Sequence, residues 1–109
     1  MNENIPNQLY ENFLHRLVGK FFKIMPLKEE KSPTLKLYLT SLKIDIIGCS
    51  ELIKDMNYDD RFLELLNVLQ YFLSHEYDQK TCHREVMKCI AITKRLYHDY
   101  SGNLWRKND

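Results

Sequence analysis

The feature that most constrains this chain is a seam of apolar residues whose spacing alternates between four and three positions. The seam lies in the middle of the chain and consists of Leu35, Leu39, Leu42, Ile46, Cys49, Ile53 and Met56. An α-helix, with about 3.6 residues per turn, brings such positions onto one face, whereas a strand through the isoleucine-rich centre would break the spacing on both sides. Ser32 followed by Pro33 is a typical helix start. The sequence therefore predicts one long helix over residues 33–56.

Two further segments show amphipathic helical patterns. Residues 7–24 carry two neighbouring rows of apolar side chains at i, i+4 spacing, and Pro26 is expected to end this helix because proline has no backbone N–H to donate. Residues 60–75 repeat the alternation of four and three positions, with Asn57 or Asp59 as the N-terminal cap. Each helix is expected to bury one side and expose the other.

The last helix is predicted over residues 79–100, with Asp78 as its N-terminal cap, because its apolar positions again alternate by four and three. Gly102 is expected to end it and to leave residues 101–109 as a flexible tail. Short connections place successive helices side by side in opposite directions. The predicted fold is all-α, a single antiparallel up-down four-helix bundle over residues 1–109.

Composition limits the classes of function. Sixteen Lys and Arg against fifteen Asp and Glu leave a formal net charge of +1, so no strong global field attracts nucleic acid or an anionic membrane. No apolar run approaches the length of a membrane span, and the N-terminal residues do not resemble a signal peptide. Three cysteines without paired spacing argue against a disulfide framework. We therefore expect a cytoplasmic protein that does not bind membranes.

No set of residues in the sequence is typical of an enzyme or of a metal site. Cys82, His83 and Cys89 are close in sequence, but they lack the pair of ligands on a turn with which structural zinc sites usually begin. Both cysteines, like Cys49, fall on apolar seams. No glycine-rich phosphate loop or nucleophile elbow is present. We expect no catalytic residue, metal or cofactor, and a thiol or metal site at Cys82 to Cys89 is the least favoured hypothesis.

Large apolar and aromatic side chains exceed what the seams require, which favours a surface that binds another protein. The expected surface combines the polar side of the first helix with two aromatic residues, and it comprises His15, Arg16, Lys20, Lys23, Tyr38 and Trp105. Leu37, Ile44 and Ile47 lie outside the main seam of their helix, and a second copy of the chain could cover them in a homodimer. We therefore expect a non-enzymatic interaction module, an adaptor or an inhibitor. The abundance of Lys, Asn, Ile and Tyr favours an AT-rich bacterial or phage genome as its source.

The alternative is a regulator that binds nucleic acid through the last helix and the C-terminal tail. The basic residues of this surface are Arg84, Lys88, Lys94, Arg95, Arg106 and Lys107. No helix-turn-helix pattern precedes them to place the helix in a groove. This alternative predicts an affinity that falls steeply as salt rises, because bound counterions are released from the phosphates.

Overall fold

The computed structural model describes residues 4–52 and 60–107, and the side chains of residues 9, 11–49 and 60–99 within them. Four long helices, α1 (Asn4–Phe22), α3 (Leu35–Leu52), α5 (Asp60–Ser74) and α6 (Gln79–Lys107), account for most of this part of the chain. A short helix, α2 (Ile24–Glu29), follows α1. No strand occurs in the two described ranges, so the all-α prediction is confirmed.

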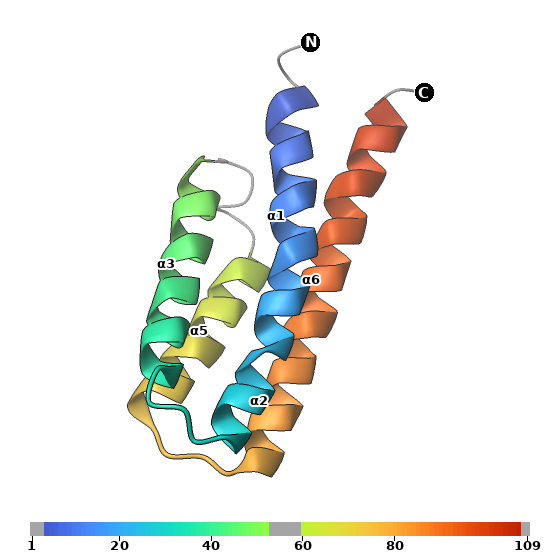
Figure 1. Cartoon of the computed structure of the whole chain (residues 1–109). Coiled ribbons are helices and arrows are strands. Elements are labelled where there is room, and N and C mark those ends of the chain that lie inside the picture. Colours follow the sequence, from blue (N-terminus) through green and yellow to red (C-terminus); the bar gives the residue numbers. More distant parts are fainter. Residues whose placement is uncertain (1–3, 53–59, 108–109) are drawn as a thin grey trace.

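The helices lie along the length of an elongated molecule that measures 48 × 21 × 20 Å. The most extensive contact joins the first and last long helices, α1 and α6, and the start of α1 and the end of α6 lie at the same end of the molecule (Figure 1). Helices α3 and α5 form a second pair, which meets the first mainly through contacts of α5 with α6 and of α2 and α1 with α3. Helix α3 therefore packs on its neighbours along one side of the molecule, opposite α6 (Figure 1).

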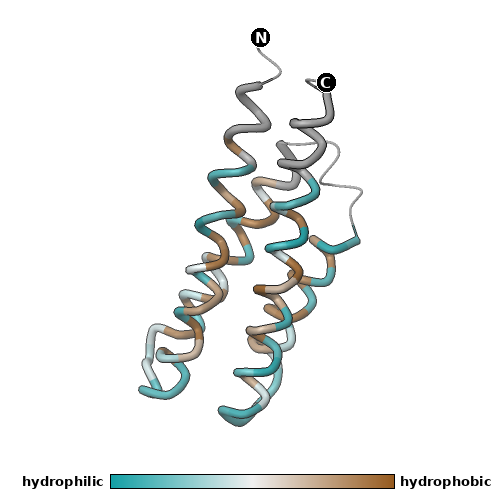
Figure 2. The backbone as a smooth tube through the Cα atoms, turned by 90° about the vertical axis from the view of Figure 1, so that its right-hand side faces the viewer, coloured by the Kyte–Doolittle hydropathy of each residue, from teal (hydrophilic) through white to brown (hydrophobic). Residues whose placement is uncertain are grey.

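The core is built from the predicted apolar seams. Apolar and polar positions alternate along every helix (Figure 2), as amphipathic helices require. The largest fully buried side chains come from all five helices and are Leu14, Leu17, Phe21, Ile24, Leu39, Leu42, Ile46, Leu65, Leu69, Val86 and Leu96. Thr93 is the buried polar residue of the described side chains, and its hydroxyl donates to the carbonyl of Cys89 at 2.8 Å. Burying each large side chain contributes about 1.5–3 kcal/mol, so these seams supply much of the stability.

The first helix does not end at Pro26. It ends at Phe22, and after Lys23 the chain resumes as α2 with Pro26 inside its first turn. Proline has no N–H, so it cannot donate to the carbonyl of Phe22 four residues earlier, and the break falls at this point. The backbone N–H of Lys23 still donates to the carbonyl of Gly19 at 3.2 Å, and that of Leu27 to the carbonyl of Lys23 at 3.3 Å. The helix is therefore interrupted at Lys23, but helical hydrogen bonds continue on both sides of this position.

The start of α3 also differs from the prediction. Ser32 and Pro33 precede the helix, which begins at Leu35. The hydroxyl of Ser32 accepts a hydrogen bond from the N–H of Thr34 at 3.2 Å, so it closes a local turn directly before the helix. Lys31, just before this turn, has a φ of 54°, in the left-handed region. The end predicted at residue 56 lies outside the described residues, since α3 is described to Leu52.

The start of α6 follows the prediction, but its end does not. A carboxylate oxygen of Asp78 accepts a hydrogen bond from the N–H of Thr81 at 2.8 Å, the expected N-terminal capping interaction. The helix then runs across Ser101 and Gly102 to Lys107, where a flexible tail was expected. A glycine permits a helix to end in the left-handed conformation but does not force it, and inside a helix it costs only about 1 kcal/mol relative to alanine.

Candidate interaction surface

The polar side of α1, predicted as the partner-binding surface, is divided between two neighbouring helices. His15 lies toward α6, with its ring centroid 6.2 Å from that of Tyr97. Lys20 and Lys23 lie toward α3, where the ammonium of Lys20 is 3.3 Å from a carboxylate oxygen of Asp45. The residues of the predicted surface therefore lie against two different helices, α6 and α3.

The structure does bring Lys20, Lys23 and Tyr38 together. The Tyr38 hydroxyl donates to the backbone carbonyl of Lys20 at 2.8 Å, and the Lys23 ammonium lies 5.8 Å from the centroid of the Tyr38 ring. Burial raises the pKa of the Tyr38 phenol. This tyrosine connects α3 to α1. Arg16 is exposed and donates from Nε to the carbonyl of Asn12 at 3.4 Å, within its own helix.

The C-terminal part of the predicted surfaces lies outside the described side chains. The backbone of α6 includes positions 105–107, but the side chains of Trp105, Arg106 and Lys107 are not among the described ones. The partner-binding set therefore reduces to residues on α1 and α3, and the nucleic-acid set to four residues of α6.

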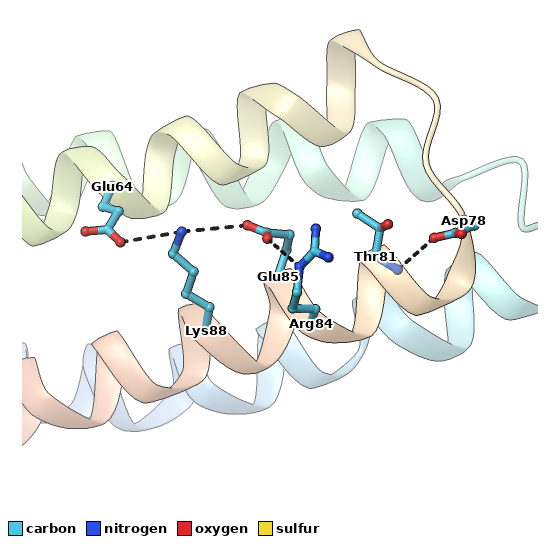
Figure 3. A network of polar contacts seen from close by, with 6 residues as sticks. All are labelled: Glu64, Asp78, Thr81, Arg84, Glu85 and Lys88. Carbon is cyan, nitrogen blue, oxygen red and sulfur yellow. Dashed lines mark hydrogen bonds and ion pairs between the residues drawn. The ribbon is translucent and has the colours of Figure 1, made fainter.

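Acidic neighbours lie beside two of these four basic residues (Figure 3). Nε of Arg84 lies 3.2 Å from a carboxylate oxygen of Glu85. The Lys88 ammonium lies between Glu64 of α5, at 3.8 Å, and Glu85, at 3.9 Å. Arg95 is exposed farther along the helix. Positive charge on this side of α6 is therefore partly neutralised, which weakens the attraction for a polyanion.

Lys94, the remaining basic residue of this set, lines a small pocket between α1 and α6. The pocket has a volume of about 190 Å³, and its other lining residues are Leu14, His15, Val18 and Tyr97. Its walls are mostly apolar, and its size suits a single side chain more than a whole ligand. It brings His15 and Lys94, which were predicted for two different surfaces, into one groove.

An apolar surface on α3 is the feature that the predicted site residues missed. We define the α3 face as five exposed residues along the outer side of this helix: Leu37, Thr40, Ser41, Ile44 and Gly48. None of the five is charged. The charged residues beside this face interact with other parts of the molecule. Lys43 donates to Gln70 of α5 at 2.6 Å, and Asp45 pairs with Lys20. Lys36 lines a pocket at the start of the helix.

The α3 face contains two of the most exposed large apolar side chains in the described part of the protein. Leu37 is 69% exposed and Ile44 is 61% exposed. A Cβ built on Gly48 would meet no atom within 4 Å, so the space above the helix is open there. The signal was present in the sequence, because Leu37 and Ile44 lie outside the apolar seam of their helix. Ile47, which shares that property, is half-buried and does not belong to this face.

The cysteines belong to the interior. Cys82 and Cys89 are fully buried and Cys49 is half-buried. Burial raises the pKa of the Cys89 thiol to about 12 and that of Cys49 to about 11, so both stay protonated near neutral pH. Nδ1 of His83 lies 3.1 Å from the sulfur of Met25, toward α2. Among the described side chains, no group of three or more His, Cys, Asp or Glu is arranged to hold a metal ion.

Comparison with protein-family models, with curated proteins and with solved structures gives no significant match to this chain. Within residues 4–52 and 60–107, no helix has both the length and the apolar character needed to cross a lipid bilayer. Functional inference therefore depends on the surfaces of the molecule itself.

Proposed function

We propose that this protein is a non-enzymatic interaction module, an adaptor or an inhibitor, that binds a protein partner through the α3 face. The observation that carries the proposal is the exposure of Leu37 and Ile44 on a helix side without charged residues. The solvent side of a helix in a globular protein normally carries polar and charged side chains. Contiguous exposed apolar surface instead marks a site of association.

The spacing on the α3 face suits a helical partner. Leu37 and Ile44 are seven residues apart, so they lie two turns apart along the same line of the helix. Ser41 and Gly48 lie beside them and are small, which allows another backbone to come close to α3. An amphipathic helix whose apolar seam packs along these residues would cover both large side chains.

The proposal takes the four long helices as an antiparallel up-down bundle in one cytoplasmic domain. The contacts of α1 with α3, α3 with α5, α5 with α6 and α6 with α1 support this arrangement, because each long helix then has two long-helix neighbours, as in a four-helix bundle. In such a bundle α3 lies at a corner, and its outer side is open to a partner.

A second copy of the chain is one candidate for the partner helix. A two-fold axis across the α3 face would place the same apolar residues against each other, which makes the contact self-complementary. Sedimentation velocity over a range of protein concentrations separates this case from a monomer. A constant monomer mass leaves only a different protein as the partner.

Capture from lysate of the native host tests the proposal. The tagged protein is compared with a Leu37→Gln and Ile44→Gln double variant and with Leu9→Gln as the control, all with nuclease present. Leu9 is a matched control because it is also 61% exposed but lies on α1. We expect a stoichiometric partner that the wild type and the control retain and the double variant loses. A partner that the double variant also retains would show that the α3 face is not the binding surface.

Binding to nucleic acid remains the alternative prediction. The ion pairs on α6 weaken the case for it. Glu64 and Glu85 accompany Arg84 and Lys88, so fewer cations are left to replace the counterions of a phosphate backbone. Fluorescence anisotropy with a labelled duplex at two salt concentrations tests it. Binding that weakens steeply with salt would favour this alternative over the protein partner.

A further inference from the structure

A second surface feature lies at the end of the molecule where α2 and the start of α3 meet the end of α5 and the residues after it (Figure 1). A pocket of about 530 Å³ opens there, a volume in the range of small-molecule sites. Its apolar walls are formed by Leu35, Leu39, Phe72, Leu73 and Tyr77. Leu39 and Phe72 are buried, so the floor of the pocket is part of the core.

Positive charge lies on the α2 and α3 side of this pocket. The Lys28 ammonium sits 4.3 Å from the centroid of the Tyr77 ring, a cation–π contact that holds it at the wall. Lys36 is exposed and belongs to the first turn of α3. The N-terminal end of this helix adds a partial positive charge on the same side.

The opposite side of the pocket is formed by the C-terminal end of α5 and the residues after it. The Ser74 hydroxyl donates to the carbonyl of Gln70 at 2.7 Å and lies 3.0 Å from Nδ1 of His75. The His75 ring stacks on Tyr71, with 4.8 Å between the centroids. Glu76 places one carboxylate at this rim. Two lysines and one carboxylate therefore lie around the pocket.

We infer that this pocket binds a small amphipathic carboxylate, whose anionic group lies near Lys28 and Lys36 and whose apolar body lies against Leu35, Leu73 and Tyr77. The apolar walls require a ligand with a hydrophobic body, and the two lysines require a negative head group. Glu76 is one carboxylate against two lysines, so the formal charge around the pocket still favours an anion. The site is independent of the α3 face and of the proposed partner.

The neutral state of Tyr77 fits this ligand. The phenol is uncharged near neutral pH, as in an ordinary tyrosine, and burial, with a further effect of Cys82, raises the pKa of Tyr77 to about 12. The wall beside Lys28 therefore adds no negative charge that would repel a carboxylate.

An NMR titration of the full chain tests the inference. Sodium octanoate and octanol share one apolar chain and differ in the head group. We expect saturable shift changes at the backbone amides of Leu35, Leu73 and Tyr77, and an affinity for octanoate that exceeds that for octanol. A Lys28→Met and Lys36→Met double variant should bind octanoate about tenfold more weakly and octanol unchanged, because only the charge contribution is lost.

Lys94→Met is the matched control, because this exposed lysine lines the smaller pocket between α1 and α6. It should leave octanoate binding unchanged. Any of four results would overturn the inference. Two concern affinity: equal affinity for octanoate and octanol, or an affinity for octanoate that the Lys28 and Lys36 double variant leaves unchanged. The other two are shift changes that map to Val18 in the smaller pocket, and the absence of any saturable shift change. If the double variant does not give the spectrum of a folded protein, Lys36→Met alone carries the same comparison, since this side chain is exposed.

Discussion

Two leucines of α3, only two residues apart, should lose very different amounts of stability on the same substitution. Leu39 has no exposed surface, whereas Leu37 is 69% exposed on the α3 face. Both lie in the same helix, so a change to alanine alters the helix propensity equally at the two positions. The comparison therefore isolates the contribution of burial.

The expected magnitudes follow from these exposures. Leu39→Ala removes a buried side chain and leaves a cavity, which costs about 2–5 kcal/mol of the free energy of unfolding. Because Leu37 is 69% exposed, less than a third of its surface is buried. Leu37→Ala should therefore lower the free energy of unfolding by only about 0.5–1 kcal/mol. The midpoint of thermal unfolding should fall by roughly 10–20 °C for Leu39→Ala and by a few degrees for Leu37→Ala.

Urea unfolding monitored by circular dichroism at 222 nm, repeated at several protein concentrations, measures both values. A monomer predicts that the cost of Leu37→Ala is small and independent of concentration. Equal costs for the two variants at every concentration would show that Leu37 is buried within the chain, and the argument for the α3 face would fail. A cost for Leu37→Ala that grows with protein concentration would instead identify a homodimer as the state in which this face is covered.

Three further predictions follow from single contacts. Tyr38→Phe removes the hydrogen bond to the Lys20 carbonyl and should lower the free energy of unfolding by about 0.5–1.5 kcal/mol, as measured by urea unfolding. The buried Cys89 thiol, whose pKa is raised to about 12, should react with a thiol reagent slowly in the native protein and rapidly in urea, and fast native reaction would contradict its burial. Hydrogen bonds from Thr81, its side chain first and its backbone N–H second, lower the pKa of Asp78, so the stability contributed by the carboxylate is present above the ordinary value of 3.8 and is lost as the pH falls through the lowered pKa. Wild type should therefore exceed Asp78→Asn in stability at neutral pH and lose that advantage in acid, and a difference that does not change with pH would refute the assignment.

Much of the fold could be predicted because the apolar spacing of each helix is a local property. Leu39, Leu42 and Ile46 were placed on the buried seam of one helix by their spacing, and the structure buries all three. Asp78 was placed before the last helix by its capping chemistry, and it accepts the expected hydrogen bond. Helix ends were less predictable, as the continuation past Pro26 shows, because tertiary contacts can extend a helix beyond a residue that disfavours it.

The predicted interaction surface shows what local patterns omit. His15 and Lys20 lie on the polar side of one helix, but they face different neighbours, α6 for the first and α3 for the second. Lys88 forms part of a basic stripe in the sequence, but Glu64 of a second helix, α5, lies beside it. The charge and exposure of a surface side chain depend on residues that are distant in the sequence.

The sequence by itself determined that this chain forms amphipathic helices, where their apolar seams lie and which side chains are too large or too numerous for those seams. The tertiary structure decided which surplus side chains remain exposed, so that Leu37 and Ile44 stay on the surface while Ile47 is half-buried. It also assembled the pocket of Lys28, Lys36 and Tyr77 from two segments far apart in the chain. The physical reason is that the 3.6-residue period fixes the faces of each helix locally, whereas the choice of neighbour for each face depends on how all the helices pack together.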